Sequence, residues 1–254
     1  MCLYPKLIEN KKYKVNKKNK GIVPMVNDTR VLLVPVGCGN CIECRKQKMR
    51  MWQVRLLEEL RHDSTGKFVT LTFSDIALNE LYNSNKIKTG DNKIDENEAA
   101  TVAVRYFLER WRKETKKSVK HWLITELGHN ETKRIHIHGI IFTNDVEMIK
   151  KKWEKYGLVY IGDYVNERTI NYIVKYVNKV DTVNKGYKPK ILCSKGIGSG
   201  YLKRIDSKIN AYREGETKEY YRTKSGHKIN LPIYYRNNLY TDEEREKLWL
   251  KKTR

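Results

Sequence analysis

The chain has 254 residues, of which 39% are hydrophobic, so it is long enough and apolar enough to bury a core. Lysine and arginine outnumber aspartate and glutamate by 52 to 30, which gives a net charge of +22. Such an excess predicts an anionic partner, foremost nucleic acid, whose phosphates release counterions when basic side chains bind; the alternative is a generic basic surface. No apolar run of about eighteen residues or signal-peptide pattern is present, so we expect a soluble protein without a membrane partner.

The N-terminal part of the chain is basic and precedes a helix. Residues 1–20 are rich in lysine and predict an extended arm that leads into a strand at 30–36. Residues 41–62 have apolar side chains at helical spacing and predict a long amphipathic helix. The run 68–73, Phe-Val-Thr-Leu-Thr-Phe, is β-branched and aromatic, and it predicts a strand.

The remaining elements alternate between helices and strands. In chain order we predict a polar loop or insertion at 76–98 with a turn at 90–92, a helix at 98–117, strands at 120–127 and 134–142 joined by a hairpin through 128–132, a helix at 145–156 capped by Asn144, a strand at 158–165, a helix at 167–180, a loop at 180–201 and a final helix at 242–252. Because hairpin and helical connections are mixed, the predicted fold class is α+β, with a central antiparallel β-sheet flanked by helices.

Two histidines interrupt an apolar, strand-like run. His136 and His138 are two residues apart, and such side chains share one face of a sheet, so both rings can reach one ion. Glu126 lies on the preceding predicted strand, and a hairpin could bring its carboxylate to the same face. Two imidazoles and a carboxylate suit Mg²⁺ or Mn²⁺ with positions left open for phosphate oxygens. The alternatives are surface histidines on an edge strand or a non-haem iron site; His121 and His129 are predicted at the surface or in turns.

Two tyrosines repeat a Tyr-x-x-Lys pattern on the predicted helix 167–180. Tyr172 and Tyr176 are four residues apart, which places both hydroxyls on one helical face, about 6 Å apart along the axis. A nearby cation, such as Lys175 or Lys179, favours the phenolate, which could then attack a phosphodiester. The alternative is that the tyrosines only pack against the core as part of an amphipathic helix.

Four cysteines lie within the first 44 residues. Cys2, Cys38, Cys41 and Cys44 could form a structural Zn²⁺ site, since four thiolates suit this ion. The Cys-x2-Cys-x2-Cys spacing is not the usual pair of knuckles and Cys2 is distant, so packed thiols are the alternative. Cysteines so few and so close do not form a disulfide framework, which favours a reducing cytoplasm; Cys193 is expected to be a free thiol.

Three ordered motifs together resemble those of the HUH endonucleases. They are Phe68-Val-Thr-Leu-Thr-Phe73, Arg134-Ile-His-Ile-His-Gly-Ile-Ile-Phe142 and Tyr172-Ile-Val-Lys-Tyr-Val-Asn-Lys179. The doubled tyrosines look like those of the rolling-circle replication initiators of microviruses, especially the gokushovirus group of single-stranded DNA bacteriophages. The likeness also covers 38–45 and 194–201, and hence most of the chain.

The resemblance implies a fold, a reaction and a set of site residues. It implies an RRM-like core whose central strand carries His136 and His138 as metal ligands, with Glu126 as a third ligand. Tyr172 and Tyr176 are implied to be alternating nucleophiles, and Lys175 and Lys179 to be helpers at the phosphate or the metal. The implied reaction is nicking of single-stranded DNA at a viral replication origin, with a 5′-phosphotyrosine intermediate and later strand rejoining.

The resemblance also implies partners and a division of the chain. Unwinding and synthesis would be left to a host helicase and polymerase in the cytoplasm of a bacterial host. We predict a basic N-terminal arm with the cysteine cluster at 1–44, an HUH nuclease core at 45–180 and a basic C-terminal extension packed on that core at 181–254. The alternatives are a plasmid initiator, relaxase or transposase of the same superfamily, and a non-catalytic nucleic-acid-binding protein.

Overall fold

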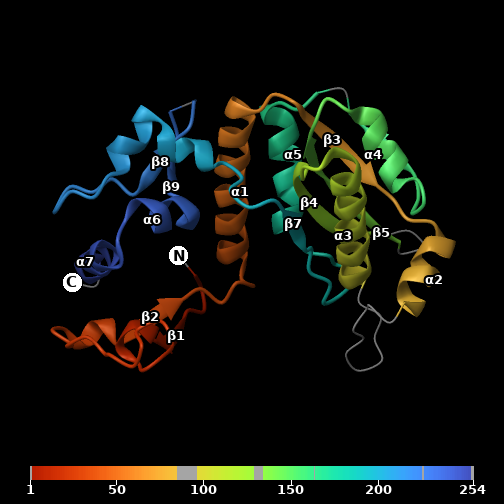
Figure 1. Cartoon of the computed structure of the whole chain (residues 1–254). Helices are drawn as coiled ribbons and strands as arrows, with labels where there is room; N and C mark the ends of the chain where they lie inside the picture. The colour runs from red at the N-terminus through yellow and green to blue at the C-terminus, as the bar shows by residue number, and fades with distance from the viewer. Residues whose placement is uncertain (1, 85–95, 129–133, 163, 225, 253–254) are drawn as a thin grey trace. The chain divides into compact units, whose positions relative to one another are not determined.

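The computed structural model describes residues 2–84, 96–128, 134–162, 164–224 and 226–252 (Figure 1). The chain divides into two compact units, of which one comprises residues 53–200 and the other comprises residues 1–52 and 201–254. The boundary falls within the long helix α1 (Ile42–His62), at the position where the sequence predicts a helix. The predicted turn at 90–92 and the part of the predicted hairpin that holds His129 lie outside the described residues.

A five-stranded antiparallel sheet forms the centre of the unit 53–200. Its strands are β3 (Gly66–Leu71), β4 (Lys120–Leu127), β5 (Ile135–Phe142), β6 (Val159–Ile161) and β7 (Ile191–Cys193). The order across the sheet is β6-β3-β5-β4-β7, and each neighbouring pair is antiparallel. β5 is therefore the middle strand, and its backbone is held by hydrogen bonds on both sides.

The two faces of this sheet differ because side chains alternate along each strand. Ile135, Ile137 and Ile141 of β5 are buried in a hydrophobic core. That core is completed by the helices α2 (Asp75–Asn83), α3 (Glu96–Thr115) and α4 (Val146–Trp153). His136 and His138 point to the opposite face, where helix α5 (Glu167–Asn178) lies. The α+β class with an antiparallel sheet flanked by helices is confirmed (Figure 1).

Helix α5 has strong local determinants. Asn166 caps it by accepting a hydrogen bond from the backbone N–H of Thr169, and the Thr169 side chain accepts one from the Asn166 backbone N–H, which completes a capping box. Its buried side chains recur at helical spacing and are Ile170, Ile173, Val174 and Val177. This apolar stripe fixes the rotation of the helix, so Tyr172 is exposed and Tyr176 lies at the margin of the buried face.

Two predicted loops contain regular structure. The predicted loop 76–98 begins with α2, because the Ser74 side chain accepts from the N–H of Ala77 and the following apolar residues enter the core. The predicted loop 180–201 contains β7, which pairs with β4. Both predictions were wrong at these residues, because polar composition hid an amphipathic helix and a three-residue edge strand.

Two smaller predictions were also wrong. His121 is buried rather than at the surface, and its ring contacts the backbone oxygen of Val119 and the hydroxyl of Ser194. Burial, opposed by the hydrogen bond to Val119, lowers the pKa of His121. The cap of α4 is Asp145 rather than Asn144, since its carboxylate accepts from the N–H of Met148.

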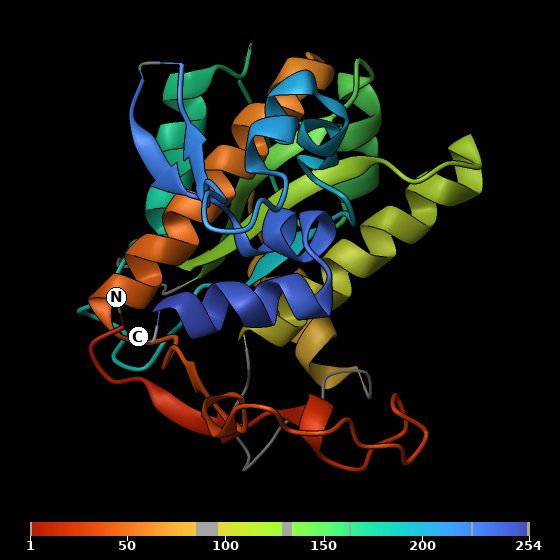
Figure 2. The same cartoon turned by 90° about the vertical axis from the view of Figure 1, so that its left-hand side faces the viewer.

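The other unit is built from short elements. They are the strands β1 (Lys6–Glu9) and β2 (Leu33–Val36), which form one antiparallel ribbon, β8 (Tyr220–Arg222) and β9 (Lys228–Asn230), which form another, the short 3-10 helices at 11–13, 29–31 and 205–210, and the helices α6 (Ile233–Leu239) and α7 (Asp242–Lys252). The predicted extended arm thus contains a strand, and the predicted final helix is confirmed. Figure 2 shows the ribbon of β1 and β2 leading into α1. No helix in the described part of the chain is long and apolar enough to cross a bilayer.

Candidate active site

The middle strand β5 positions the two histidines. In its register with the neighbouring strands, His136 is paired with Glu126 of β4, and His138 is paired with Thr70 of β3. The two imidazoles lie on one face with their ring centroids 6.4 Å apart and their planes inclined by 27°. The alternation of the strand therefore places both rings side by side above the centre of the sheet.

Glu126 connects the histidines with the end of α5. Its Oε2 lies 2.9 Å from His138 Nε2, diagonally across the strand pair, and its Oε1 accepts a hydrogen bond from Lys179 Nζ. Burial alone would raise the pKa of this half-buried carboxyl, but the hydrogen bonds from His138 and Lys179 prevail and lower it. Glu126 is thus an ionised oxygen donor at neutral pH.

Thr70 is a site residue that sequence reasoning missed. Its hydroxyl lies 3.0 Å from His138 Nδ1, so it holds the ring from the side opposite Glu126. Such a contact on one ring nitrogen orients the other nitrogen, here Nε2, as a ligand atom. The alternation in 68–73 could have placed Thr70 on a sheet face, but only the register of β3 with β5 shows that this face is the one with the histidines.

The donor set fits a divalent cation of the Mg²⁺ or Mn²⁺ kind in chemistry more closely than in spacing. Burial and the neighbouring His138 lower the pKa of His136, which favours the neutral imidazole that binds metals. In the described part of the chain, however, the only group of three or more ligand residues whose donor atoms all lie within 4.8 Å of one another is a cysteine cluster. A shared ion would therefore require the His136 ring to move towards His138 and Glu126.

The two tyrosines of α5 lie over this cluster. Their hydroxyl oxygens are 2.9 Å apart, and their rings meet edge to face with centroids 5.7 Å apart. The Tyr176 ring stacks on His138 at 4.8 Å with an interplanar angle of 12°, whereas the Tyr172 ring contacts the edge of Phe68 and is 51% exposed. Helical spacing thus brings both hydroxyls to one point on the histidine face of the sheet.

The environment of Tyr176 disfavours its phenolate. Partial burial, followed by the hydrogen bond with Tyr172, raises the pKa of Tyr176. A positive charge near the hydroxyl is therefore needed before this side chain can act as a nucleophile at neutral pH. The Lys179 ammonium lies 5.8 Å from the centre of the Tyr176 ring and supplies part of that charge.

The two lysines predicted as helpers lie in different environments. Lys179 follows the last turn of α5 and is hydrogen-bonded to Glu126, so it belongs to the cluster. Lys175 is exposed one turn earlier, and among the described residues it makes no hydrogen bond or ion pair. Lys175 is therefore free to meet a ligand from solvent, whereas Lys179 already neutralises a carboxylate.

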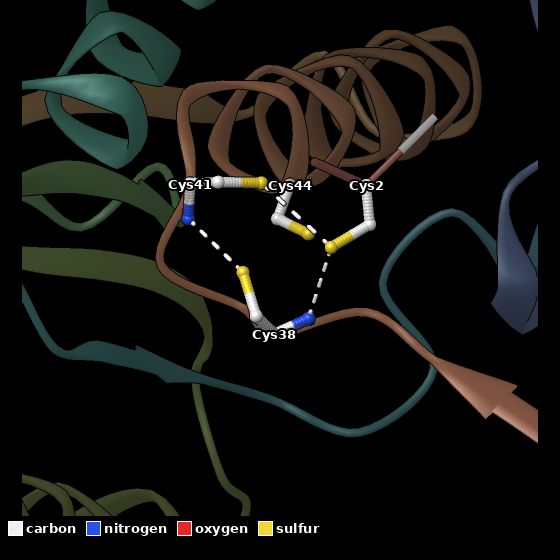
Figure 3. Close-up of side chains that lie close together, drawn as sticks. All are labelled: Cys2, Cys38, Cys41 and Cys44. Carbon is white, nitrogen blue, oxygen red and sulfur yellow. Dashed lines mark hydrogen bonds between the residues drawn. The ribbon is translucent and has the colours of Figure 1, made fainter. Parts of the chain in front are cut away.

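The four clustered cysteines lie in the other unit. Cys2, Cys38, Cys41 and Cys44 are gathered at the start of α1 (Figure 3). Cys193 lies apart from them in β7 and is a free, exposed thiol.

Comparison with known proteins matches the segment that carries the candidate active site. Residues 66–181 match the family model described as replication-associated protein ORF2. The match runs from the first residue of β3 past the end of α5 and includes every candidate active-site residue described above. The segment is therefore similar to replication-associated proteins.

One solved structure and the curated proteins give two further results. The catalytic domain of the Adeno Associated Virus type 5 Rep protein matches at 16% identity over 73% of this chain and 98% of that chain, with a TM-score of 0.22. No curated protein matches the sequence.

Proposed function

We propose that this protein is a replication initiation endonuclease that nicks single-stranded DNA at an origin through a tyrosine and later rejoins the strand. The observation that carries the proposal is the pair of hydroxyls of Tyr172 and Tyr176, 2.9 Å apart, on a helix whose second tyrosine stacks on His138. The similarity of residues 66–181 to replication-associated proteins supports the same conclusion.

The proposed reaction is a pair of transesterifications. In the first, the Oη of one tyrosine forms a bond to a backbone phosphorus while the bond from that phosphorus to the 3′ oxygen breaks. The tyrosine hydroxyl loses its proton, the departing oxygen gains one, and the products are a 5′-phosphotyrosine and a free 3′-OH. In the reverse sense, a 3′-OH attacks the phosphotyrosine and releases the tyrosine, so no ATP is required to reseal the strand.

The chain assigns different tasks to the residues around the tyrosines. His136, His138 and Glu126 would hold the divalent cation, and Thr70 would keep the His138 ring in place. When bound, the cation polarises the phosphodiester and offsets its charge. Lys179 holds Glu126 and adds positive charge beside Tyr176, while the exposed Lys175 can contact a DNA phosphate.

The proposed substrate is the origin of a small circular single-stranded DNA replicon of the microvirus kind. The net charge of +22 suits a polyanionic partner, and exposed tyrosines offer stacking surfaces for unpaired bases. The proposal assigns catalysis to residues 45–180 and leaves 1–44 and 181–254 as flanking basic parts. A host helicase and polymerase would complete replication in the bacterial cytoplasm.

Adduct formation tests the proposal. The full chain is incubated with labelled circular single-stranded DNA of a microvirus genome and Mn²⁺ or Mg²⁺, and then run on a denaturing gel. We expect a labelled band that migrates with the protein, resists boiling in detergent and disappears with protease or with chelator. A chain that binds this DNA tightly but forms no adduct under any of these conditions is instead a non-catalytic nucleic-acid-binding protein.

The substitution Thr70→Val tests the support of His138. Valine keeps the shape of threonine and removes the hydroxyl that contacts Nδ1, so we expect the Mn²⁺ concentration for half-maximal adduct formation to rise by about 10- to 100-fold. The matched control is Thr101→Val, whose hydroxyl only donates to the backbone oxygen of Asn97 within α3. Equal Mn²⁺ requirements in the two variants would show that Thr70 does not support the metal ligand.

A further inference from the structure

The four cysteines at the start of α1 converge on one point, although Cys2 is far from the others in the sequence. One sulfur from each residue is available, and the four sulfurs all lie within 4.8 Å of one another (Figure 3). The sulfurs of Cys2 and Cys41 are 3.8 Å apart. Four thiolates arranged tetrahedrally at about 2.3 Å from a zinc ion lie about 3.8 Å from one another, whereas disulfide sulfurs are about 2 Å apart.

The backbone around Cys38 and Cys41 is turned as a metal-binding loop requires. Gly39 has φ of +75°, a conformation that L side chains rarely adopt, and the turn brings the N–H of Cys41 to 3.3 Å from the sulfur of Cys38. Gly37 leaves room for the cluster, because a Cβ at this position would lie 3.1 Å from the sulfur of Cys44.

Cys2 is held in the same way from the other end of the segment. Its sulfur accepts hydrogen bonds from the N–H groups of Tyr4 and Cys38, at 3.3 Å and 3.2 Å. Backbone donors aimed at sulfur stabilise the thiolate form, which is the form that binds metals. Two sulfurs of the cluster therefore already have N–H donors that suit a negative charge.

The segment that the cysteines enclose lacks a core of its own. Among the described residues 2–41, Val31 is the only fully buried side chain, and large apolar residues such as Leu7, Ile22 and Met25 are exposed. The ribbon pairs Lys6 with Val36, so Cys2 and Cys38 extend from the same end of it. A segment that buries so little needs another constraint to hold one structure, and metals supply it in small folds.

We infer that Cys2, Cys38, Cys41 and Cys44 bind one Zn²⁺ ion that ties the N-terminus and the end of the β1–β2 ribbon to the start of α1. The four thiols give up their protons on binding, and the site is tetrahedral with no open position. Its role is structural, and it is separate in sequence and ligand type from the histidine cluster.

The full chain, expressed with added zinc and purified under reducing conditions without chelator, tests this inference. We expect about one zinc per chain by elemental analysis. Replacement with Co²⁺ is expected to give the visible absorption and the thiolate charge-transfer bands of a tetrahedral cobalt–sulfur centre. Chelator should expose the segment 2–41 to limited proteolysis, because the metal is what holds it.

Matched variants separate this site from the other candidate ligands. Cys38→Ser and Cys41→Ser should lose the stoichiometric zinc, whereas Cys193→Ser and the double variant His136→Ala with His138→Ala should keep it. Should a serine variant fail to fold, the cobalt spectrum of the unmodified chain still decides. A chain without stoichiometric metal, a cobalt form without thiolate bands, or zinc that persists in Cys38→Ser and Cys41→Ser would overturn the inference.

Discussion

Replacing both Tyr172 and Tyr176 with phenylalanine is expected to abolish the covalent adduct with origin DNA, a loss on the order of 10⁶-fold. Phenylalanine keeps the ring contacts with Phe68 and His138 and removes only the two hydroxyls, so the fold should be preserved. The measurement is the rate of appearance of the protein-linked DNA band in the presence of Mn²⁺.

The single variants should differ from the double variant. Because each of the two hydroxyls can reach the same region, Tyr172→Phe and Tyr176→Phe are each expected to retain some first cleavage but to lose transfer of the strand to a second tyrosine. Tyr164→Phe is the matched control, since Tyr164 is an exposed tyrosine outside the cluster. Adduct formation by the double variant at the rate of this control would place the nucleophile elsewhere.

The double variant His136→Ala with His138→Ala should lose adduct formation by a factor on the order of 10³ or more, because two of the three proposed ligands are gone. Binding of single-stranded DNA should change far less, since it rests on the distributed positive charge. The measurement compares the adduct rate across a Mn²⁺ titration with the DNA affinity of the same protein.

The control for the histidine variants is His227→Ala, which removes an exposed imidazole far along the chain. This variant should behave as the unmodified chain in both assays. A double histidine variant that forms the adduct at the normal rate and the normal Mn²⁺ requirement would contradict the metal assignment while leaving the tyrosine assignment open.

The parts of the fold that the sequence predicts correctly are those governed by local periodicity. β4 occupies 120–127 and β5 occupies 135–142 because β-branched and aromatic residues fill those runs, and α5 begins where Asn166 can cap it. The same periodicities place His136 with His138 on one sheet face, and Tyr172 with Tyr176 on one helical face.

The features that the sequence does not predict depend on contacts between distant residues. Thr70 reaches His138 only through the register of β3 with β5, and Cys2 reaches Cys41 only because the β1–β2 ribbon brings its ends together. His121 is buried because β7 adds to the sheet edge beside it and supplies the hydroxyl of Ser194. Local composition contains none of this information, since each partner lies more than thirty residues away.

Mass spectrometry of the trapped protein–DNA adduct tests the central claim most directly. The adduct formed with Mn²⁺ and origin DNA is digested with nuclease and protease, and the modified peptide is sequenced. We predict a nucleotide 5′-phosphate on the peptide that contains Tyr172 and Tyr176, attached to one of these two side chains. A phosphodiester on any other residue, or an adduct-free digest from a preparation that has cleaved the DNA, would contradict the proposed mechanism.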